Sequence, residues 1–417
     1  MESALTESTF YPRNAAIKLQ AALTDTPVIC LLGPRQSGKT TLVKALEPTR
    51  AYITLDDSTV LQFARQDPDG FIQSLPDQVT LDEVQRAPEL LVAIKSAVDQ
   101  RRTPGRFLLT GSANLLLLPA VQESLAGRME VMHLHTLSAS ELHHRPPHFL
   151  STLLDGQFDT AITGPNTVLT GLAEMLCQGG YPEPIKRTPA RARQWHRQYL
   201  NAIVQRDVKD IANIQDEDAM LRLLELLSLR TATLLNINSL ANDLGIQRAT
   251  AEKYLCVLER LFLVRRLAPW HHNQATRLIK TPKIHIVDSG LAATLGKLTA
   301  ENWLLQGTEF GHLLESFVVQ QIVCQADCLD DDIKLSHYRD KDQVEVDLVI
   351  ERGNDVWGVE VKKASSIDRN KDGAGLGRLA DRAGKNFKGG VLLYAGSHTL
   401  PLARKGIMVA PLSSLWL

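Results

Sequence analysis

The clearest chemical signal in the sequence is a loop suited to binding phosphate groups. The pattern GxxxxGK(S/T) is matched by Gly33, Pro34, Arg35, Gln36, Ser37, Gly38, Lys39 and Thr40. The apolar run 27–32 predicts a buried strand before the loop, and residues 40–46 predict a helix after it. In such a loop backbone N–H groups bind phosphate oxygens, Lys39 reaches the β- and γ-phosphates, and Thr40 offers its hydroxyl to Mg²⁺. We therefore expect a site for ATP and Mg²⁺; the alternative is a glycine-rich turn before an ordinary helix.

Two acidic residues end the next chemically informative strand. The run Val79–Leu81 is apolar and is followed by Asp82 and Glu83. We expect Asp82 to hold Mg²⁺ and Glu83 to orient and deprotonate the attacking water. A third run, 106–109, leads into Ser112. Because ligands lie at the carboxyl ends of parallel strands, Ser112 is predicted to contact the γ-phosphate or the water. The alternative for Ser112 is a plain strand-to-helix turn.

Arg128 is the candidate for a cation that stabilises the charge developing during phosphoryl transfer. It follows Gly127 after a predicted helix. Such arginines often come from a neighbouring subunit, so we expect a homo-oligomer. A surface or structural role for Arg128 is the alternative, and Arg35 within the loop is a weaker candidate for the same function.

The middle of the chain carries a possible DNA-reading unit. A capped helix over 239–244, a turn at Gly245, a second helix over 248–261 and a strand over 263–267 predict a winged helix-turn-helix. Gln247, Arg248 and Lys253 are expected to face outward from the second helix and contact nucleic acid. Residues 186–280 contain 16 Lys and Arg against 9 Asp and Glu, an excess of seven basic residues that favours such a partner. The alternative is a packing module.

The C-terminal part carries carboxylates in a pattern typical of metal-dependent nucleases. Asp347 lies on one predicted strand, and Glu360-Val361-Lys362 lies on the next, across a Gly353-Asn354 turn. Period-two alternation predicts that Glu345, Asp347, Glu360 and Lys362 share one face. With Glu315 from a helix, Asp347 and Glu360 would bind a divalent metal, and Lys362 would activate the water. A solvated charged hairpin is the alternative.

Length and composition limit the kind of protein. The chain has 417 residues, 44% hydrophobic and 22% charged, with 46 Lys and Arg against 47 Asp and Glu. These values exclude a wholly disordered chain and a generic polycation. Five scattered cysteines without a CxxC pair argue against a disulfide framework or structural zinc. The N-terminus lacks a signal-peptide core and no run reaches eighteen apolar residues, so we expect a cytoplasmic protein without a membrane span.

The expected fold class is α/β, in three domains. Alternating short apolar runs and helical stretches over 1–150 predict a parallel α/β ATPase domain. Residues 167–282 are predicted to form the helical, winged-helix domain, and 283–417 an α/β domain. The stretch between the first two is rich in turn residues and is taken as a linker or insertion.

Together these residues resemble a prokaryotic AAA-type ATPase family whose C-terminal half is a domain of unknown function similar to the PD-(D/E)XK nuclease fold. The resemblance covers nearly the full chain and is carried by 33–40, 81–85, 109–112 with 125–128, 179–183, 206–208, and 345–347 with 360–362. It implies ATP binding and hydrolysis. The leading hypothesis is an ATPase whose nucleotide state controls a DNA-facing winged helix and a nuclease-like domain. The alternatives are an ATP-gated, Mg²⁺-dependent DNA nuclease and a nucleotide-switched interaction protein with an inactive nuclease-like fold.

Overall fold

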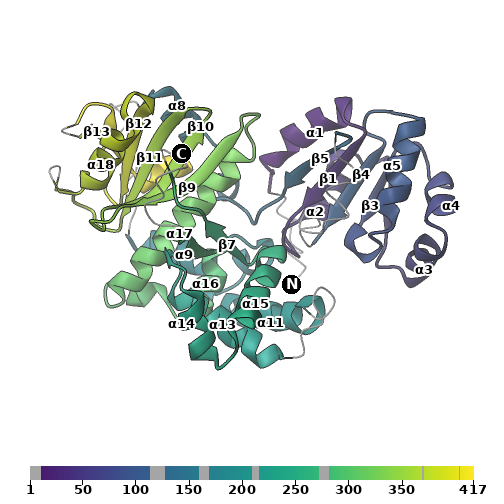
Figure 1. The fold of residues 1–417 in the computed structure, drawn as a ribbon, viewed down its shortest axis with the longest axis horizontal. Helices are drawn as coiled ribbons and strands as arrows, with labels where there is room; N and C mark the ends of the chain where they lie inside the picture. Colours follow the sequence, from purple (N-terminus) through teal and green to yellow (C-terminus); the bar gives the residue numbers. More distant parts are fainter. Residues whose placement is uncertain are drawn as a thin grey trace, which may run out of the picture.

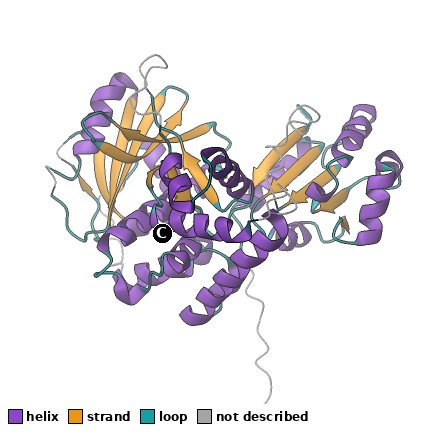
Figure 2. Ribbon diagram, turned by 60° about the horizontal axis from the view of Figure 1, so that its bottom comes forward, coloured by secondary structure: helices purple, strands orange, loops and turns teal. Residues whose placement is uncertain are grey.

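The fold was analysed in a computed structural model, which describes residues 11–112, 127–158, 169–208, 216–271, 281–368, 371–402 and 404–417. In Figure 1 the N-terminal sheet and its helices form the right side of the molecule, and the C-terminal sheet lies at the left. A mainly helical region joins them. Turned forward, the same arrangement shows the two large sheets at opposite ends of the molecule with helices between them (Figure 2).

The N-terminal sheet is parallel, with strand order β2-β3-β4-β1-β5. Its strands are β1 (Val28–Leu32), β2 (Ala51–Thr54), β3 (Val79–Asp82), β4 (Phe107–Gly111) and β5 (Met129–His133). Every residue of β1, β3 and β4 is buried, as expected for strands covered on both faces by helices. The helices are α1 (Ala15–Asp25), α2 (Lys39–Leu46), α3 (Ser58–Gln66), α4 (Pro68–Gln73), η1 (Val84–Arg86) and α5 (Leu90–Gln100). The predicted parallel α/β sheet is confirmed.

The register of this sheet brings several strand ends to one edge. Leu32 pairs with Gly111, Leu81 with Leu109, and Thr54 with Asp82. Since all five strands run the same way, the residues that follow β1, β3 and β4 meet at the carboxyl edge. This edge therefore holds the phosphate-binding loop, the acidic pair and Ser112.

The middle region is mainly helical and includes a small antiparallel sheet of order β6-β8-β7. The helical elements are α7 (Ala139–Leu142), α8 (Phe149–Asp155), α9 (Leu169–Gln178), α10 (Pro182–Ile185), α11 (Pro189–Ile203), η3 (Val204–Val208), α13 (Glu217–Leu229), α14 (Ile237–Leu244), α15 (Arg248–Arg260), α16 (Ser289–Leu295) and η4 (Ala300–Asn302). The strands are β6 (Thr233–Leu234), β7 (Val264–Leu267) and β8 (Lys283–Ile286). Helix α14 begins where the Asn236 side chain accepts from the Ser239 N–H, and it ends at Gly245, whose φ is 68°.

Strand β8 corrects one sequence expectation. The sequence placed residues from 283 onward at the start of the C-terminal domain, but β8 is the central strand of the small middle sheet and is entirely buried. It pairs on one side with β6 and on the other with β7. Its alternating pattern identified a strand, whereas its partners depend on long-range pairing that no local pattern encodes.

The C-terminal region contains a six-stranded mixed sheet of order β13-β14-β12-β11-β10-β9. The strands are β9 (Ile333–Arg339), β10 (Glu345–Arg352), β11 (Asp355–Lys362), β12 (Phe387–Tyr394), β13 (Leu400–Pro401) and β14 (Ile407–Pro411). The helices are α17 (Gly307–Ala326), α18 (Ala374–Ala383), η5 (Gly384–Asn386) and η6 (Leu412–Leu415). Helices α17 and α18 cover opposite faces, because Leu348 and Val359 pack in the cluster with α17 and Val349 and Val356 in the cluster with α18.

The cores show how the regions are joined. The N-terminal sheet has two clusters of its own, one on each face. A single large cluster instead runs from the middle helices through α17 into the C-terminal sheet. The middle and C-terminal regions thus share a core and pack as one body. Within the described part of the chain, no helix is both long and apolar enough to cross a membrane.

Candidate functional site

The phosphate-binding loop runs from β1 into α2 and is held closely by its neighbours. A Cβ at Gly33 would overlap the carbonyl oxygen of Leu134, so only glycine fits there. Gly38 has a φ of 97°, a conformation that favours glycine, and it is the N-cap of α2. The buried Arg13 side chain braces the loop from outside, with Nη1 donating to the Ser37 carbonyl at 2.6 Å and Nη2 to the His135 carbonyl at 2.6 Å.

Lys39 lies folded over this loop. Its Nζ donates to the carbonyl oxygens of Gly33 and Pro34, both at 2.9 Å, and the side chain is buried. Burial lowers the pKa of Lys39 to about 8, although the nearby carboxylates of Glu83 and Asp82 oppose that shift. An ammonium that is poorly solvated and bonded only to neutral carbonyls is well suited to bind a phosphate group instead.

Asp82 is anchored at the end of β3 beside the loop. Its Oδ2 accepts from the Tyr52 hydroxyl and lies 3.3 Å from Thr40 Oγ1, while Oδ1 accepts from the Thr110 hydroxyl. The Thr40 hydroxyl and the Asp82 carboxylate are therefore neighbours. Hard oxygen ligands of this kind suit Mg²⁺, so the residues present fit that ion.

Glu83 is held in a three-residue cluster. Ser112 Oγ donates to Glu83 Oε2 at 2.9 Å, and Gln85 Nε2 donates to the same oxygen and to Ser112 Oγ, the latter at 2.9 Å. The backbone of Glu83 has a φ of 59°, which is uncommon for a residue with a side chain. Two donors and a restricted backbone together fix the direction of the carboxylate.

Arg128 lies at the opposite edge of the sheet. It directly precedes β5, whose first residue Met129 pairs with Val28 at the start of β1. Its Nε lies 2.5 Å from Asp99 Oδ1 on α5. The loop begins after Leu32, about 13 Å further along the strands. Arg128 is therefore not brought together with the loop, Asp82 and Glu83 of its own chain.

Arg35 points out of the loop toward the middle region. Its Nη2 lies 2.7 Å from Asp207 Oδ1 on η3, and its carbonyl oxygen accepts from the Tyr199 hydroxyl at 3.2 Å. Both partners belong to the continuous helical stretch α11–η3. The loop that would bind phosphate is thus attached directly to the helical region.

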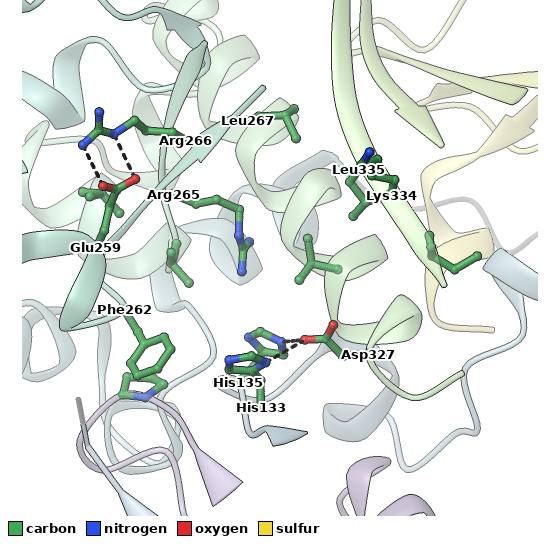
Figure 3. Close-up of a pocket in the computed structure, with 15 residues that line it drawn as sticks. His133, His135, Glu259, Phe262, Arg265, Arg266, Leu267, Asp327, Lys334 and Leu335 are labelled. Atoms are coloured by element: carbon green, nitrogen blue, oxygen red, sulfur yellow. Dashed lines mark hydrogen bonds and ion pairs between the residues drawn. The ribbon is translucent and has the colours of Figure 1, made fainter. Parts of the chain in front are cut away.

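A cavity of about 510 Å³ lies on the same boundary and is lined by Pro34 of the loop and by residues of the middle and C-terminal regions. Figure 3 shows Arg265 of β7 reaching toward His133 and His135, which lie beside Asp327. His135 Nε2 is 2.6 Å from Asp327 Oδ2. Burial alone would raise the pKa of Asp327, but the hydrogen bond and charge of His135, together with the charges of His133 and Arg265, lower it. The boundary is therefore polar and partly open rather than a continuous apolar core.

The outward face of α15 carries the three residues predicted to contact nucleic acid. Gln247, Arg248 and Lys253 are all exposed. Glu252 is instead turned toward β7, where its carboxylate lies 2.5 Å from Arg266 Nη1. Its negative charge is therefore compensated by an arginine.

The C-terminal carboxylates are arranged differently from the expected metal site. Lys283 Nζ of β8 lies 2.7 Å from Glu315 Oε1, 3.4 Å from Glu345 Oε2 and 3.6 Å from Asp347 Oδ1. Lys283 is only 2% exposed. Burial alone would lower its pKa, but the carboxylates of Glu315 and Asp347 raise the pKa of Lys283 above its ordinary value. A charged ammonium thus stands among the carboxylates.

Glu360 and Lys362 form a separate pair. Lys362 Nζ lies 2.9 Å from Glu360 Oε1, and a Cβ on Gly375 of α18 would approach Glu360 Oε2. Burial and the neighbouring Asp347 charge raise the pKa of Glu360 to about 7. Glu360 therefore faces α18, whereas Glu315 lies on α17 across the sheet.

A register shift explains why the predicted common face is broken. The hairpin turn was predicted correctly, with Arg352 opposite Asp355 and Glu351 opposite Val356. The pairing of β10 with β9, however, shifts between Val346 and Val349. Val346 accordingly packs on the α18 side and Leu348 on the α17 side, against strict alternation. Across the described ranges, no three His, Cys, Asp or Glu side chains are gathered closely enough to hold a metal ion. Glu315, Asp347 and Glu360 are thus not brought together as one ligand set.

The chain is 30% identical over 400 residues to "Uncharacterized protein Rv2008c" of Mycobacterium tuberculosis, across 94% of this chain and 81% of the relative. "Uncharacterized protein Mb2031c" of Mycobacterium bovis matches with the same values. The chain belongs to this protein family.

Three family models match successive parts of this chain. An "AAA domain" matches residues 25–143, "Domain of unknown function (DUF8612)" matches 169–302, and "Domain of unknown function (DUF4143)" matches 310–415. The first match covers the loop, Asp82, Glu83, Ser112 and Arg128. The N-terminal parallel sheet is therefore an AAA-type P-loop ATPase domain.

Solved structures match this chain only at low identity and with low TM-scores. The Walker-type ATPase PABY2304 of Pyrococcus abyssi is 15% identical, with 71% of this chain and 98% of that chain covered and a TM-score of 0.42. The RuvB Holliday junction branch migration motor of Thermotoga maritima is 19% identical, with coverages of 61% and 88% and a TM-score of 0.29.

For several residues of the phosphate-binding site and of the C-terminal carboxylate cluster, the sequence predicted no role. These residues are Tyr52, which contacts Asp82, and Gln85, which contacts Glu83. Arg13 contacts the phosphate-binding loop, and Lys283 lies within the carboxylate cluster. Gln85 lies within the 81–85 stretch that carries the family resemblance, but no role was predicted for it. For the other three no local signal exists, because their contacts depend on strand order and on segments distant in sequence.

Proposed function

We propose that the protein binds ATP with Mg²⁺ and hydrolyses it. The observation that carries this proposal is the convergence, at one sheet edge of an AAA-type domain, of Lys39, the Thr40–Asp82 pair and the fixed Glu83 carboxylate. The loop and Lys39 would bind the phosphates, and Thr40 and Asp82 would hold Mg²⁺, which withdraws charge from the β- and γ-phosphates. Glu83, oriented by Ser112 and Gln85, would take a proton from the attacking water.

We further propose that the nucleotide state is passed to the middle region. Arg35 and the adjoining loop backbone contact Asp207 and Tyr199, so a change in the loop on nucleotide binding would move α11 and η3. The helix-turn-helix formed by α14 and α15, followed by β7 and β8, supports a winged helix that faces DNA through Gln247, Arg248 and Lys253. A homo-oligomer would let Arg128 reach the site of a neighbouring subunit.

The C-terminal domain is proposed to have a nuclease-like fold. The support is the placement of Asp347 on β10 and of Glu360 and Lys362 on β11, with Glu315 on a helix that covers the sheet. The choice between an ATPase that controls this domain and an ATP-gated nuclease then depends on whether the domain cleaves DNA. The separation of Glu360 from Glu315 favours the first.

One experiment tests these proposals together. Purified full-length protein is incubated with Mg²⁺ and labelled DNA, with and without ATP, and both phosphate release and DNA cleavage are measured. We expect phosphate release, stimulated by DNA, without cleavage. Lys39→Ala should abolish release, because the loop loses the cation that neutralises the β/γ-phosphates. Release that is unchanged in Lys39→Ala would contradict the ATPase proposal, and ATP-dependent nicking would favour the nuclease.

A further inference from the structure

The C-terminal carboxylate cluster contains its own cation. Three carboxylates, those of Glu315, Glu345 and Asp347, surround Lys283 Nζ within 3.6 Å. They come from α17 and β10, whereas Lys283 comes from β8 of the small middle sheet. An ammonium group has three N–H donors, so it can serve three carboxylates at once.

The distances from Lys283 Nζ to the carboxylates are normal for an ammonium and longer than metal–oxygen bonds. Oxygen ligands lie about 2.0–2.1 Å from Mg²⁺, in near-octahedral geometry. Larger cations such as Ca²⁺ have oxygen ligands at up to about 2.6 Å. The nearest carboxylate is 2.7 Å from Nζ, a normal charged hydrogen bond, and the other two lie at ion-pair distance. A divalent cation held by Glu315 and Asp347 together would have to occupy the volume that Lys283 fills.

The negative charge of the cluster is also nearly neutralised without a metal. Three carboxylates are faced by Lys283 and by Arg339, whose guanidinium pairs with Glu345. With all three carboxylates ionised, the group carries one net negative charge. Burial and the Asp347 charge raise the pKa of Glu315, and a protonated Glu315 would make the group neutral. The second oxygen of Asp347 accepts the Val361 N–H at 2.8 Å, so it too is engaged. A divalent ion added here would make the group positive and would lie next to an ammonium, which Coulomb repulsion opposes.

Lys283 cannot easily withdraw. It is 2% exposed, and its strand is hydrogen-bonded on both sides, with Lys283 opposite Leu267 of β7 and Leu234 of β6. Moving the ammonium away would leave a buried charge without its carboxylate partners or would require β8 to leave its sheet. Either change is costly in a buried setting.

We propose that Lys283 is a built-in counter-ion that fills the metal position of the C-terminal nuclease-like site, so that this site does not bind Mg²⁺ or Mn²⁺ while β8 stays in the middle sheet. The predicted ligands Glu315 and Asp347 are thus joined by a lysine of another region instead of a metal. The inference favours an ATPase, or a nucleotide-switched interaction protein, over an ATP-gated nuclease. It does not depend on ATP hydrolysis.

The test is Mn²⁺ binding to the nucleotide-free, full-length protein. Binding is measured by titration calorimetry and by thermal melting. The wild type should show no Mn²⁺ site that depends on Asp347, and wild type and Asp347→Asn should respond alike. Lys283→Met removes the ammonium but keeps a long side chain, and it leaves three carboxylates facing one another. The three carboxylates are not close enough to hold a metal ion as they stand, but without the ammonium between them they can move inward. This variant should then gain a Mn²⁺ site, with a melting temperature raised by about 5 °C at saturating Mn²⁺.

A matched variant assigns the gained site. Lys283→Met combined with Asp347→Asn should lose it, whereas a site at Thr40 and Asp82 would persist in both and so report on the ATPase domain alone. If Lys283→Met does not fold with or without Mn²⁺, Lys283→Met with Glu315→Gln lowers the repulsion and is measured in its place. Asp347-dependent Mn²⁺ binding by the wild type would overturn the proposal. So would a folded variant at position 283 that gains no Mn²⁺ site.

Discussion

Arg35 and Asp207 form an ion pair between the phosphate-binding loop and the helical middle region, with 2.7 Å between Nη2 and Oδ1. The Asp207 side chain is only 8% exposed, while that of Arg35 is 31% exposed. The Tyr199 hydroxyl bonds to the backbone of the same loop residue, so side chain and backbone are both attached to the α11–η3 stretch. A loop that moves on binding phosphate therefore acts directly on these helices.

Breaking this pair should uncouple the two regions. Asp207→Asn removes the negative charge opposite Arg35 at nearly constant shape. We expect it to lower the free energy of unfolding by about 1 kcal/mol. This is at the low end for a hydrogen-bonded ion pair, because water partly screens Arg35. It should also change ATP affinity and reduce any stimulation of ATP hydrolysis by DNA. Urea unfolding, nucleotide titration and phosphate release would measure the three effects.

Asp77→Asn is the matched control for that change. It removes the same charge from an arginine pair, with Arg101, in which both side chains are mostly exposed. Stability, nucleotide affinity and DNA stimulation should all stay near wild type. Equal effects of the two substitutions would show that the Arg35–Asp207 contact has no special role.

Glu83→Gln should separate ATP binding from ATP hydrolysis. The amide keeps the shape and the contacts to Ser112 and Gln85 but cannot accept a proton from water. We expect ATP affinity within a few-fold of wild type and phosphate release lowered by about 10²-fold or more. Glu89→Gln, at an exposed position at the start of α5, should leave both unchanged. Normal turnover in Glu83→Gln would place the base elsewhere.

The site of the ATPase domain was predictable because its chemistry is local. The loop residues are contiguous, and Asp82, Glu83 and Ser112 each directly follow or end a short apolar strand. In a parallel sheet this alone brings them to one edge. Tyr52 could not be anticipated, because its contact with Asp82 depends on β2 pairing beside β3.

The C-terminal half was less predictable because its geometry depends on long-range pairing. The register of the β10–β11 hairpin followed from its turn, but the shift between β10 and β9 did not, and it moved neighbouring side chains to opposite faces. Lys283 precedes its partner Asp347 by 64 positions and lies in a different sheet. Helix α18 also escaped notice, since Gly375 and Gly377 are poor helix formers.

Arg128 should act across a subunit boundary, because it lies at the sheet edge opposite its own loop. Arg128→Ala and Lys39→Ala should each be inactive alone. Mixing them should restore part of the activity, since one subunit supplies Arg128 and the other an intact loop. Phosphate release should also rise more than linearly with protein concentration.

The control for this mixing experiment is Arg102→Ala. Arg102 is exposed and donates to the Gly127 carbonyl at 3.0 Å, so it lies beside Arg128 without being the candidate. It should be active alone and should need no complementation. A mixture of Arg128→Ala and Lys39→Ala that stays inactive, with wild-type activity strictly proportional to concentration, would rule out the shared site.

His196 should make folding stability depend on pH. It is fully buried on α11, its Nδ1 lies 2.9 Å from Thr294 Oγ1, and burial lowers its pKa to about 4. An unfolded histidine titrates near 6.5, so between these values the unfolded chain binds one more proton than the folded chain. Stability from this group is therefore complete above pH 6.5 and is lost as the pH falls toward 4. Between pH 7 and 5 the loss is roughly 2 kcal/mol. Urea unfolding of His196→Gln over this range should show a pH dependence of the unfolding free energy that is weaker by about that amount, although the variant is less stable at pH 7.

His148→Gln, at an exposed position before α8, should keep the wild-type pH dependence. An unchanged pH dependence in His196→Gln would mean that His196 is already protonated in the folded protein or contributes nothing to the acid response.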